Sequence, residues 1–156
     1  MQETTYVIFT LDAEHYAISV HCVETIIRAV QLTDVPEATE LLCGMLNMGG
    51  RFIPMVDIRK QFGLAQKPLA VSDRIMVCRV SDYTVAFGVD AIRDVTALAV
   101  GPLSSSAVIY PGMEQFLSGI AEYEGDSILI YDIDTLFPEK TIHRIESELK
   151  GMEAPV

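Results

Sequence analysis

Two aspartates, Asp57 and Asp132, are the residues whose type and placement could support general acid–base chemistry. Such chemistry needs two carboxyl groups in different environments, so that one is protonated while the other is ionised. These two instead occupy equivalent positions of a repeated segment, so each is expected to have the same structural role in its own copy. An aspartate at the end of a strand can accept backbone N–H groups of the helical turn that follows. The pattern therefore favours two structural capping residues over a catalytic pair.

The chain carries none of the common catalytic or phosphate-binding motifs: it has no Gly-x-Ser-x-Gly, no phosphate-binding loop, no dinucleotide fingerprint and no His-Glu-x-x-His. Three cysteines, Cys22, Cys43 and Cys78, lie in apolar neighbourhoods, which is typical of buried structural side chains. The histidines stand at no metal-ligand spacing from them. We therefore expect no catalytic residue, no metal and no cofactor.

The balance of charge argues against two classes of partner. Eleven basic against 22 acidic side chains give a net charge of −11. This charge repels phosphate backbones and anionic membranes, so we expect no nucleic-acid partner. No apolar run approaches the roughly 18–20 residues that span a bilayer, and the N-terminus has neither a basic segment nor an apolar signal core. The sequence therefore predicts a cytoplasmic protein without direct membrane insertion.

A segment of the chain occurs twice, at 36–62 and at 111–137. Eight positions are identical between the copies, whereas unrelated segments of this length share roughly two. The identical pairs are Pro36/Pro111, Leu42/Leu117, Gly44/Gly119, Gly50/Gly125, Ile53/Ile128, Asp57/Asp132, Ile58/Ile133 and Phe62/Phe137. The preceding segments, 6–27 and 75–96, have few identical residues and share mainly the spacing of their apolar residues.

The repeat predicts a duplicated unit within one domain that spans 1–156. Its halves lie at about 6–64 and 75–137. Because neither half alone can bury much surface, the two halves should share an interface.

Most of the local patterns predict strands. β-Branched and aromatic runs around short turns indicate two hairpins and three further strands. The hairpins are expected at 6–20 and 74–89, and the further strands at 51–57, 94–100 and 127–133.

Helical patterns are few. Pro36 suits the start of a short helix that Gly44 ends, and residues 111–118 repeat this pattern. A longer amphipathic helix is expected at about 138–150. The whole set of elements predicts a mainly β architecture of two small barrels side by side, with short helices and a C-terminal helix.

The order of the motifs resembles that of a known family. After the first hairpin come Val-x-x-Ile, then Pro, then Gly-x-x-Asn-x-x-Gly-x-x-Ile-Pro-x-Val-Asp, and later Gly-x-x-x-x-x-Gly-x-x-x-Leu-Ile-x-Asp. Over about residues 5 to 137 this resembles the CheW-like family of bacterial chemosensory adaptors. The resemblance implies two SH3-like, five-stranded barrels in a pseudo-two-fold arrangement, without catalysis or cofactor.

The resemblance also implies partners. Members of the family couple the cytoplasmic tips of methyl-accepting chemoreceptors to the regulatory domain of a CheA-type histidine kinase, at receptor arrays on the inner face of the membrane. Two motifs would lie at or near these contacts, and four other residues would be structural. The contact residues are Val23, Glu24, Thr25, Gly44, Asn47, Met48, Gly49, Gly50 and Arg51, and the structural ones are Asp57, Asp132, Gly119 and Gly125.

Two positions depart from the family pattern. Thr25 stands where the family commonly has glutamate, and Gly49 stands where it commonly has arginine. In the family these positions can form a charge pair near the contact surface. Glu24 and Arg51 are charged and lie close by, but a shift of one residue on a strand turns a side chain to the opposite face. We therefore expect a dedicated, non-standard partner.

A small-molecule-binding sensory module is the alternative function. Its site would be the groove between the two barrels, beside a proline- and serine-containing loop at Gly101–Ala107. A deep apolar cavity would favour this alternative, whereas a shallow, open groove would count against it.

Overall fold

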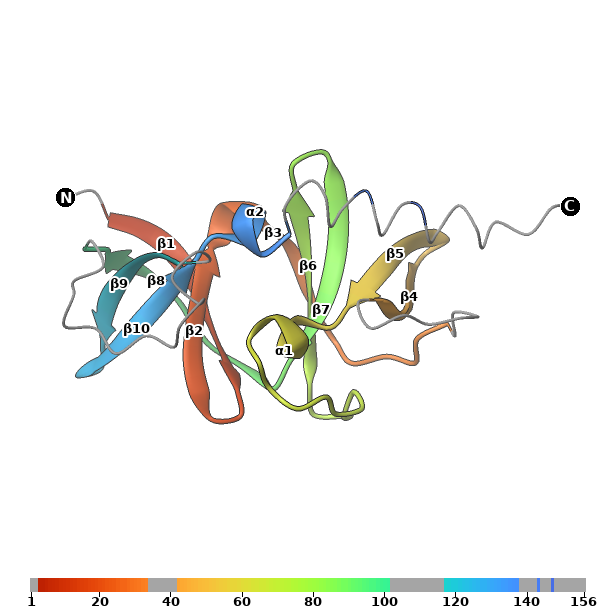
Figure 1. Ribbon diagram of the computed structural model, residues 1–156, viewed down its shortest axis with the longest axis horizontal. Coiled ribbons are helices and arrows are strands. Elements are labelled where there is room, and N and C mark those ends of the chain that lie inside the picture. Colours follow the sequence, from red (N-terminus) through yellow and green to blue (C-terminus); the bar gives the residue numbers. More distant parts are fainter. Residues whose placement is uncertain (1–2, 34–41, 102–116, 138–142, 144–146, 148–156) are drawn as a thin grey trace, which may run out of the picture.

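Two five-stranded sheets form the part of the chain that the computed structural model describes, which is residues 3–33, 42–101, 117–137, 143 and 147 (Figure 1). Within these residues the helical elements are η1 (Val20–Cys22), α1 (Ile58–Gln61) and α2 (Ile133–Leu136). The strands are β1 (Glu3–Leu11), β2 (Glu14–Ser19), β3 (Val23–Arg28), β4 (Leu42–Met48), β5 (Arg51–Val56), β6 (Arg74–Val80), β7 (Tyr83–Val89), β8 (Ala91–Ala99), β9 (Leu117–Tyr123) and β10 (Asp126–Tyr131).

The two sheets exchange strands between the two sequence halves. Sheet A has the order β8-β1-β2-β10-β9, and sheet B has the order β3-β6-β7-β5-β4. Each sheet therefore combines the first hairpin of one half with the last three strands of the other, as Figure 1 shows on either side of the molecule. The predicted mainly β fold with five strands on each side is confirmed. The sheets, however, do not coincide with the sequence halves.

Equivalent strands pair in the same register in both sheets. β10 pairs with β2 in parallel at Ile130↔Ala17, and β5 pairs with β7 in parallel at Met55↔Ala86. Residues 17 and 86 correspond in the first part of the repeat, and residues 55 and 130 correspond in the second. The remaining ladders follow the same correspondence, as in Leu46↔Ile53 and Ala121↔Ile128. The structure thus confirms the duplication.

Each sheet curls until its two ends meet at a single bridge. Gly101 exchanges two backbone hydrogen bonds with Ile120, of 2.9 and 3.1 Å, and Thr33 does so with Met45, of 2.8 and 3.0 Å. Met45 and Ile120 are equivalent positions of the repeat. Among the described residues these bridges are isolated, so the sheets approach the predicted barrels without closing along their edges.

The alternation of side chains along β1 divides the core into layers. Val7 and Phe9 belong to a large cluster between the two sheets, whereas Ile8 belongs to a smaller cluster inside the curl of sheet A. Sheet B has its own inner cluster, which includes Ile53 and Val77. The central hairpins are therefore buried on both faces, which explains why their sequences are nearly continuous apolar runs.

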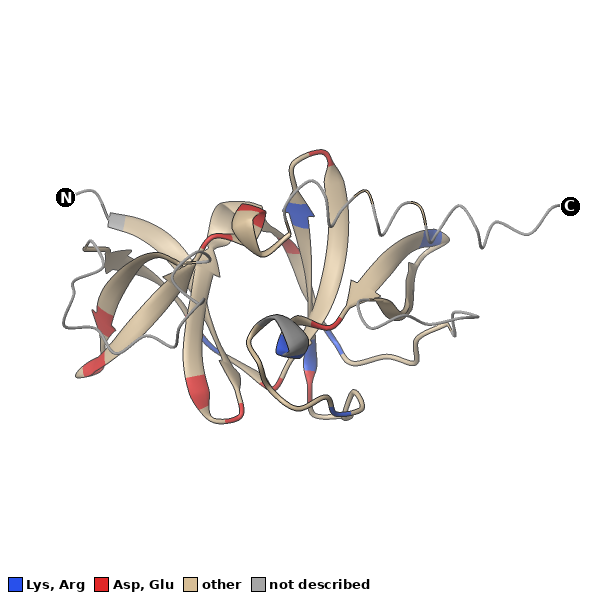
Figure 2. Cartoon of the chain, viewed as in Figure 1, with Lys and Arg blue, Asp and Glu red and all other residues tan. Residues whose placement is uncertain are grey.

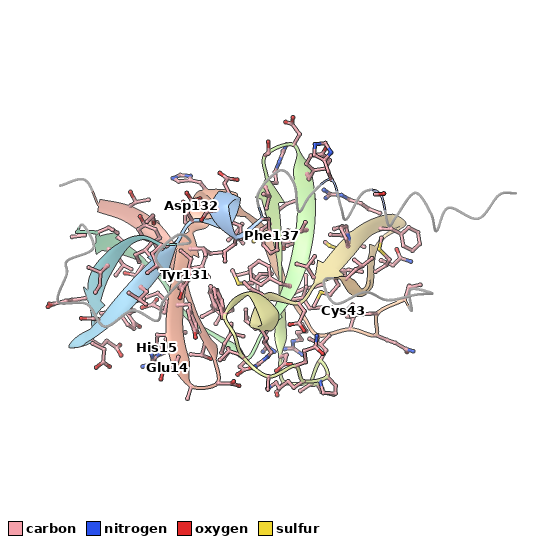
Figure 3. The ribbon with its side chains drawn as sticks, viewed as in Figure 1. Glu14, His15, Cys43, Tyr131, Asp132 and Phe137 are labelled. Atoms are coloured by element: carbon pink, nitrogen blue, oxygen red, sulfur yellow. The ribbon has the colours of Figure 1, made fainter. Side chains whose placement is uncertain are left out.

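Two phenylalanines, one at the end of each repeat, cross from one sheet to the other. Phe62 follows β5 of sheet B but stacks on Tyr16 of sheet A, with ring centroids 4.8 Å apart, and lies 4.6 Å from the ring of Tyr131. Phe137 follows β10 of sheet A but stacks on Phe87 of sheet B at 6.3 Å. Tyr131 and Phe137 both lie between the sheets (Figure 3). This reciprocal packing accounts for the identity of positions 62 and 137.

The two aspartates cap short helices, as the repeat predicted. Oδ1 of Asp57 accepts a hydrogen bond of 3.0 Å from the backbone N–H of Arg59, and Oδ1 of Asp132 accepts one of 3.0 Å from that of Asp134. Each carboxylate thereby satisfies an N–H group that the first turn of a helix leaves without an intrahelical partner.

The predicted role of Gly44 as a helix stop is wrong, because Gly44 and Gly119 lie within strands. A Cβ atom on Gly44 would lie 3.1 Å from Cβ of Leu32, and one on Gly119 would lie 2.3 Å from Cγ1 of Val100. Both glycines therefore permit the close approach of the chain that forms the edge bridge.

Three predicted features fall outside the described residues. They are the start of each short helix (36–41 and 111–116), the loop after Gly101, and the C-terminal helix at about 138–150 except for His143 and Ser147.

Arg59 joins the turns of both sheets. Its Nη1 donates to Oδ1 of Asp12 at 2.7 Å, and its Nη2 donates to Oδ1 of Asp90. The arginine side chain is only 7% exposed, and Lys67 lies 3.0 Å from Asp90. Burial alone would raise the pKa of Asp90, but hydrogen bonds from the Asp12 N–H, Lys67 and Arg59 outweigh it and hold that pKa below its usual value.

Replacing Arg59 by methionine should lower the free energy of unfolding by about 2–3 kcal/mol, because the half-buried Asp90 and the exposed Asp12 lose their shared, buried cation. Arg93→Met is the control, since Arg93 forms an exposed ion pair of 3.0 Å with Glu124, and such pairs contribute about 0–1 kcal/mol. Denaturant unfolding of both variants at pH 7 measures the difference. Equal losses in the two variants would contradict the assigned role of Arg59.

Candidate functional site

The residues predicted at partner contacts gather at one end of sheet B. Val23–Thr25 begins β3, and 47–52 forms the tip of the β4–β5 hairpin. These two segments, which we call the contact end, come from opposite edges in the strand order of the sheet. The curl of sheet B nevertheless brings their side chains together.

An ion pair links the two segments. Nη1 of Arg51 lies 2.7 Å from Oε1 of Glu24, and its Nη2 donates to Oγ1 of Thr84 on β7 at 2.9 Å. The hydrogen bond from Arg51 lowers the pKa of Glu24, and the same contact raises the pKa of Arg51. Arg51 thus bridges β5, β7 and β3 across the end of the sheet.

The one-residue shift was expected to turn Glu24 to the opposite face of its strand, but β3 carries a bulge at this residue. Val23 pairs with Cys78 and Thr25 pairs with Val77, so Glu24 has no partner of its own in the β3–β6 ladder. A bulge places two residues opposite one and re-aims the extra side chain. The usual alternation of faces therefore does not apply at Glu24. The charge pair forms from Glu24, one residue before the family's position 25, and Arg51, two residues after the family's position 49.

The hairpin turn has the backbone of a two-residue turn. Gly49 and Gly50 have φ values of +60° and +93°, and the backbone N–H of Gly50 donates to Oδ1 of Asn47 at 2.8 Å. Consecutive positive φ values match the right-handed twist of the flanking strands. The equivalent turn in sheet A has Glu124 and Gly125 at φ values of +48° and +85°. Gly50 and Gly125 are thus structural residues, whereas position 49 can carry a side chain.

Phe52 is an exposed apolar residue of the contact end that is not among the residues predicted from the sequence. It is 56% exposed and follows Arg51 directly. The equivalent residue in sheet A is Ser127, and that hairpin is acidic, with Glu122, Glu124 and Asp126. Figure 2 shows acidic residues on the β9–β10 hairpin and a basic residue at the tip of β4–β5. The sequence did contain an indication of this residue, because a large apolar side chain stands at position 52 where the other copy of the repeat has serine.

Gly44 does not take part in the surface itself. It is buried below Leu32 and Thr33, so its predicted place among the contact residues is indirect. Val23, Thr25 and Met48 are half-buried, and Asn47, Gly49 and Gly50 are exposed.

The space between the sheets gives little support to a small-molecule site. Aromatic and aliphatic side chains of the large core cluster fill it. At its border lies an open hollow of about 550 Å³ lined mainly by polar residues, among them Ser19, His21, Arg79 and Asp132. Such a hollow lacks the apolar walls that bury a small ligand.

Within the described ranges, no three histidine, cysteine or acidic side chains are grouped as metal ligands. None of the helices in these ranges has the length and apolar character needed to cross a membrane.

Comparisons with known proteins agree with the fold and the motifs. A family profile described as "CheW-like domain" matches residues 5–141. The chemotaxis protein CheW of Thermotoga maritima is 27% identical over 145 residues, which cover 91% of this chain and 93% of that protein. The chemotaxis protein CheW of Rhizobium meliloti is 24% identical over 133 residues, covering 85% and 86%. Among solved structures, the scaffolding protein TtCheW of Thermoanaerobacter tengcongensis superposes with a TM-score of 0.75 at 25% identity and covers 90% of this chain and 96% of that one.

Replacing Arg51 by methionine should return the pKa of Glu24 towards its ordinary value of 4.5, because Arg51 is the main cause of its depression. An NMR pH titration of the Glu24 carboxyl carbon measures this change. Arg79→Met is the control, since Arg79 lowers that pKa least among the contributing groups. A Glu24 pKa that is the same in the wild type and in Arg51→Met would contradict the ion pair.

Proposed function

This chain belongs to the CheW-like family, and on that premise we propose that it is an adaptor that couples methyl-accepting chemoreceptors to a CheA-type histidine kinase in bacterial chemosensory signalling. As a member of a family of scaffolding proteins, it is not an enzyme. In this role it works in the cytoplasm, at receptor arrays on the inner face of the membrane.

The contact end of sheet B is the observation that carries the proposal. An exposed aromatic residue, Phe52, follows Arg51 on β5 next to the two-residue turn, and Arg51 itself pairs with Glu24. Exposed aromatic residues next to charged rims are typical anchors of protein–protein interfaces. We assign this end to the regulatory domain of the kinase, and the region where the two sheets meet to the receptor tip.

Binding to the regulatory domain of a CheA-type kinase encoded alongside the protein should be detectable by calorimetry with a dissociation constant of about 100 μM or tighter, which is roughly 5–6 kcal/mol. Phe52→Ser should weaken this binding about tenfold or more, because it removes the anchor. Val71→Ser is the control, since Val71 is 92% exposed but lies in the linker between β5 and β6. Absence of binding, or equal weakening by both variants, would rule the assignment out.

The position of the ion pair supports a dedicated partner for this protein. Glu24 lies one residue before the family's position on β3, and Arg51 lies two residues after the family's position in the hairpin turn. Charges at an interface select partners and repel others. We therefore propose that the kinase domain recognised here carries a charge pattern shifted in the same way.

Moving the pair back with Thr25→Glu and Gly49→Arg should improve binding to a conventional kinase domain and weaken binding to the dedicated one. The arginine has room, because no atom lies within 4 Å of a Cβ built on Gly49. Its φ of +60° makes the substitution strained, at a cost of about 1–2 kcal/mol, but the equivalent Glu124 in sheet A adopts a similar φ of +48°. Calorimetry of the wild type, both single variants and the double variant against each domain measures the change. A wild type that already binds the conventional domain as tightly as a conventional adaptor would refute the specialisation.

A further inference from the structure

Two of the three cysteines lie next to each other in space. Cys78 on β6 pairs with Val23, the residue that directly follows Cys22. Neighbouring residues of a strand point to opposite faces of the sheet. Cys22 lies in η1 rather than in β3, so this rule does not turn its side chain away from Cys78. Cys78 belongs to the large core cluster between the sheets, and Cys22 packs against it. Cys22 also donates to the backbone oxygen of Ser19 at 3.0 Å.

The spacing suits a disulfide. Directly opposed residues of an antiparallel pair have Cα atoms about 4.5–5.5 Å apart. Cys22 directly precedes Val23, and its side chain packs against the same core cluster as Cys78. Disulfides span Cα separations of about 4.4–6.8 Å, so the neighbour of a directly paired residue is within reach.

The two thiols differ in access and in ionisation. Cys22 is half-buried and lines the open hollow at the border of the sheets, whereas Cys78 is fully buried. The hydrogen bond from Cys78 lowers the pKa of Cys22, against the opposing effects of burial and of Asp134 and Asp132 on α2. The contact with Cys22, together with burial, raises the pKa of Cys78. Cys22 is therefore the more accessible and the more readily ionised of the two thiols, and Cys78 is the buried thiol beside it.

We propose that Cys22 and Cys78 form a redox-sensitive pair that a hydroperoxide converts into an intramolecular disulfide. The Cys22 thiolate attacks one oxygen of the peroxide, the O–O bond breaks, and Cys22 becomes a sulfenic acid while hydroxide leaves and takes up a proton. The sulfur of Cys78 then attacks the Cys22 sulfur, the S–S bond forms, and the S–O bond breaks to release water with the proton of Cys78. The two thiols lose two electrons in total, and these reduce hydrogen peroxide to two molecules of water.

The third cysteine provides an internal contrast. Cys43 is exposed, so its predicted burial is wrong. Its Sγ donates to the backbone oxygen of Met55 at 3.2 Å, and partial desolvation of the sulfur together with the negative charge of Asp57 raises its pKa to about 11. Cys43 therefore holds little thiolate at neutral pH and should stay reduced under conditions that oxidise Cys22.

Mass spectrometry of the full-length protein tests the proposal. The reduced protein is treated with hydrogen peroxide, denatured and alkylated, and its thiols are counted. The expected result is a fall from three alkylated cysteines to one, with peptide mapping that identifies a Cys22–Cys78 disulfide and retains the label on Cys43. Dithiothreitol should restore all three thiols.

Two variants sharpen the test. Cys43→Ser should still form the disulfide, whereas Cys22→Ser should form none and leave Cys78 alkylated. The proposal is overturned if the wild type keeps three free thiols, if the disulfide joins two copies of the chain or involves Cys43, or if Cys22 oxidises to sulfinic acid while Cys78 remains free. Because mapping of the wild type alone decides between these outcomes, a variant that fails to fold does not affect the conclusion.

Discussion

The short parallel pairings of β2 with β10 and of β7 with β5 are the constraint on which the rest of the structure depends. They insert the first hairpin of each half into the sheet built by the last three strands of the other half. A hairpin in that position is covered on both faces, by the inner cluster of its own sheet and by the core between the sheets. Neither half can complete a sheet alone, so the two must fold together through contacts distant in sequence.

The exchange is reinforced by side chains that cross between the sheets. Phe62 and Phe137 each leave the sheet of the strand they follow and pack on aromatic rings of the other sheet. Arg59 adds a polar connection between Asp12, in the turn of the β1–β2 hairpin, and Asp90, which follows β7. The pseudo-two-fold relation is therefore strongest in the interior, where packing demands the same shape from both copies.

On the surface the two copies have diverged. The β4–β5 hairpin carries Gly49, Arg51 and Phe52, where the β9–β10 hairpin carries Glu124, Asp126 and Ser127. Because exposed positions contribute little to folding, a duplicated fold can present different chemistry at its two equivalent ends. Such asymmetry suits an adaptor, which must bind different partners specifically at different surfaces.

Local patterns in the sequence were sufficient to predict the duplication, most of the strands and the capping by Asp57 and Asp132. Each of these depends on neighbouring residues: alternation along a strand, a turn between two apolar runs, or a carboxylate before a helical turn. The exchange of hairpins, the closeness of Cys22 to Cys78, and the role of Gly44 below Leu32 were decided only in the tertiary structure. The same holds for the pairing of Glu24 with Arg51, which requires both the bulge in β3 and the curl that joins the ends of sheet B. These features depend on which strands become neighbours and in what register, and long-range packing of the whole chain determines both.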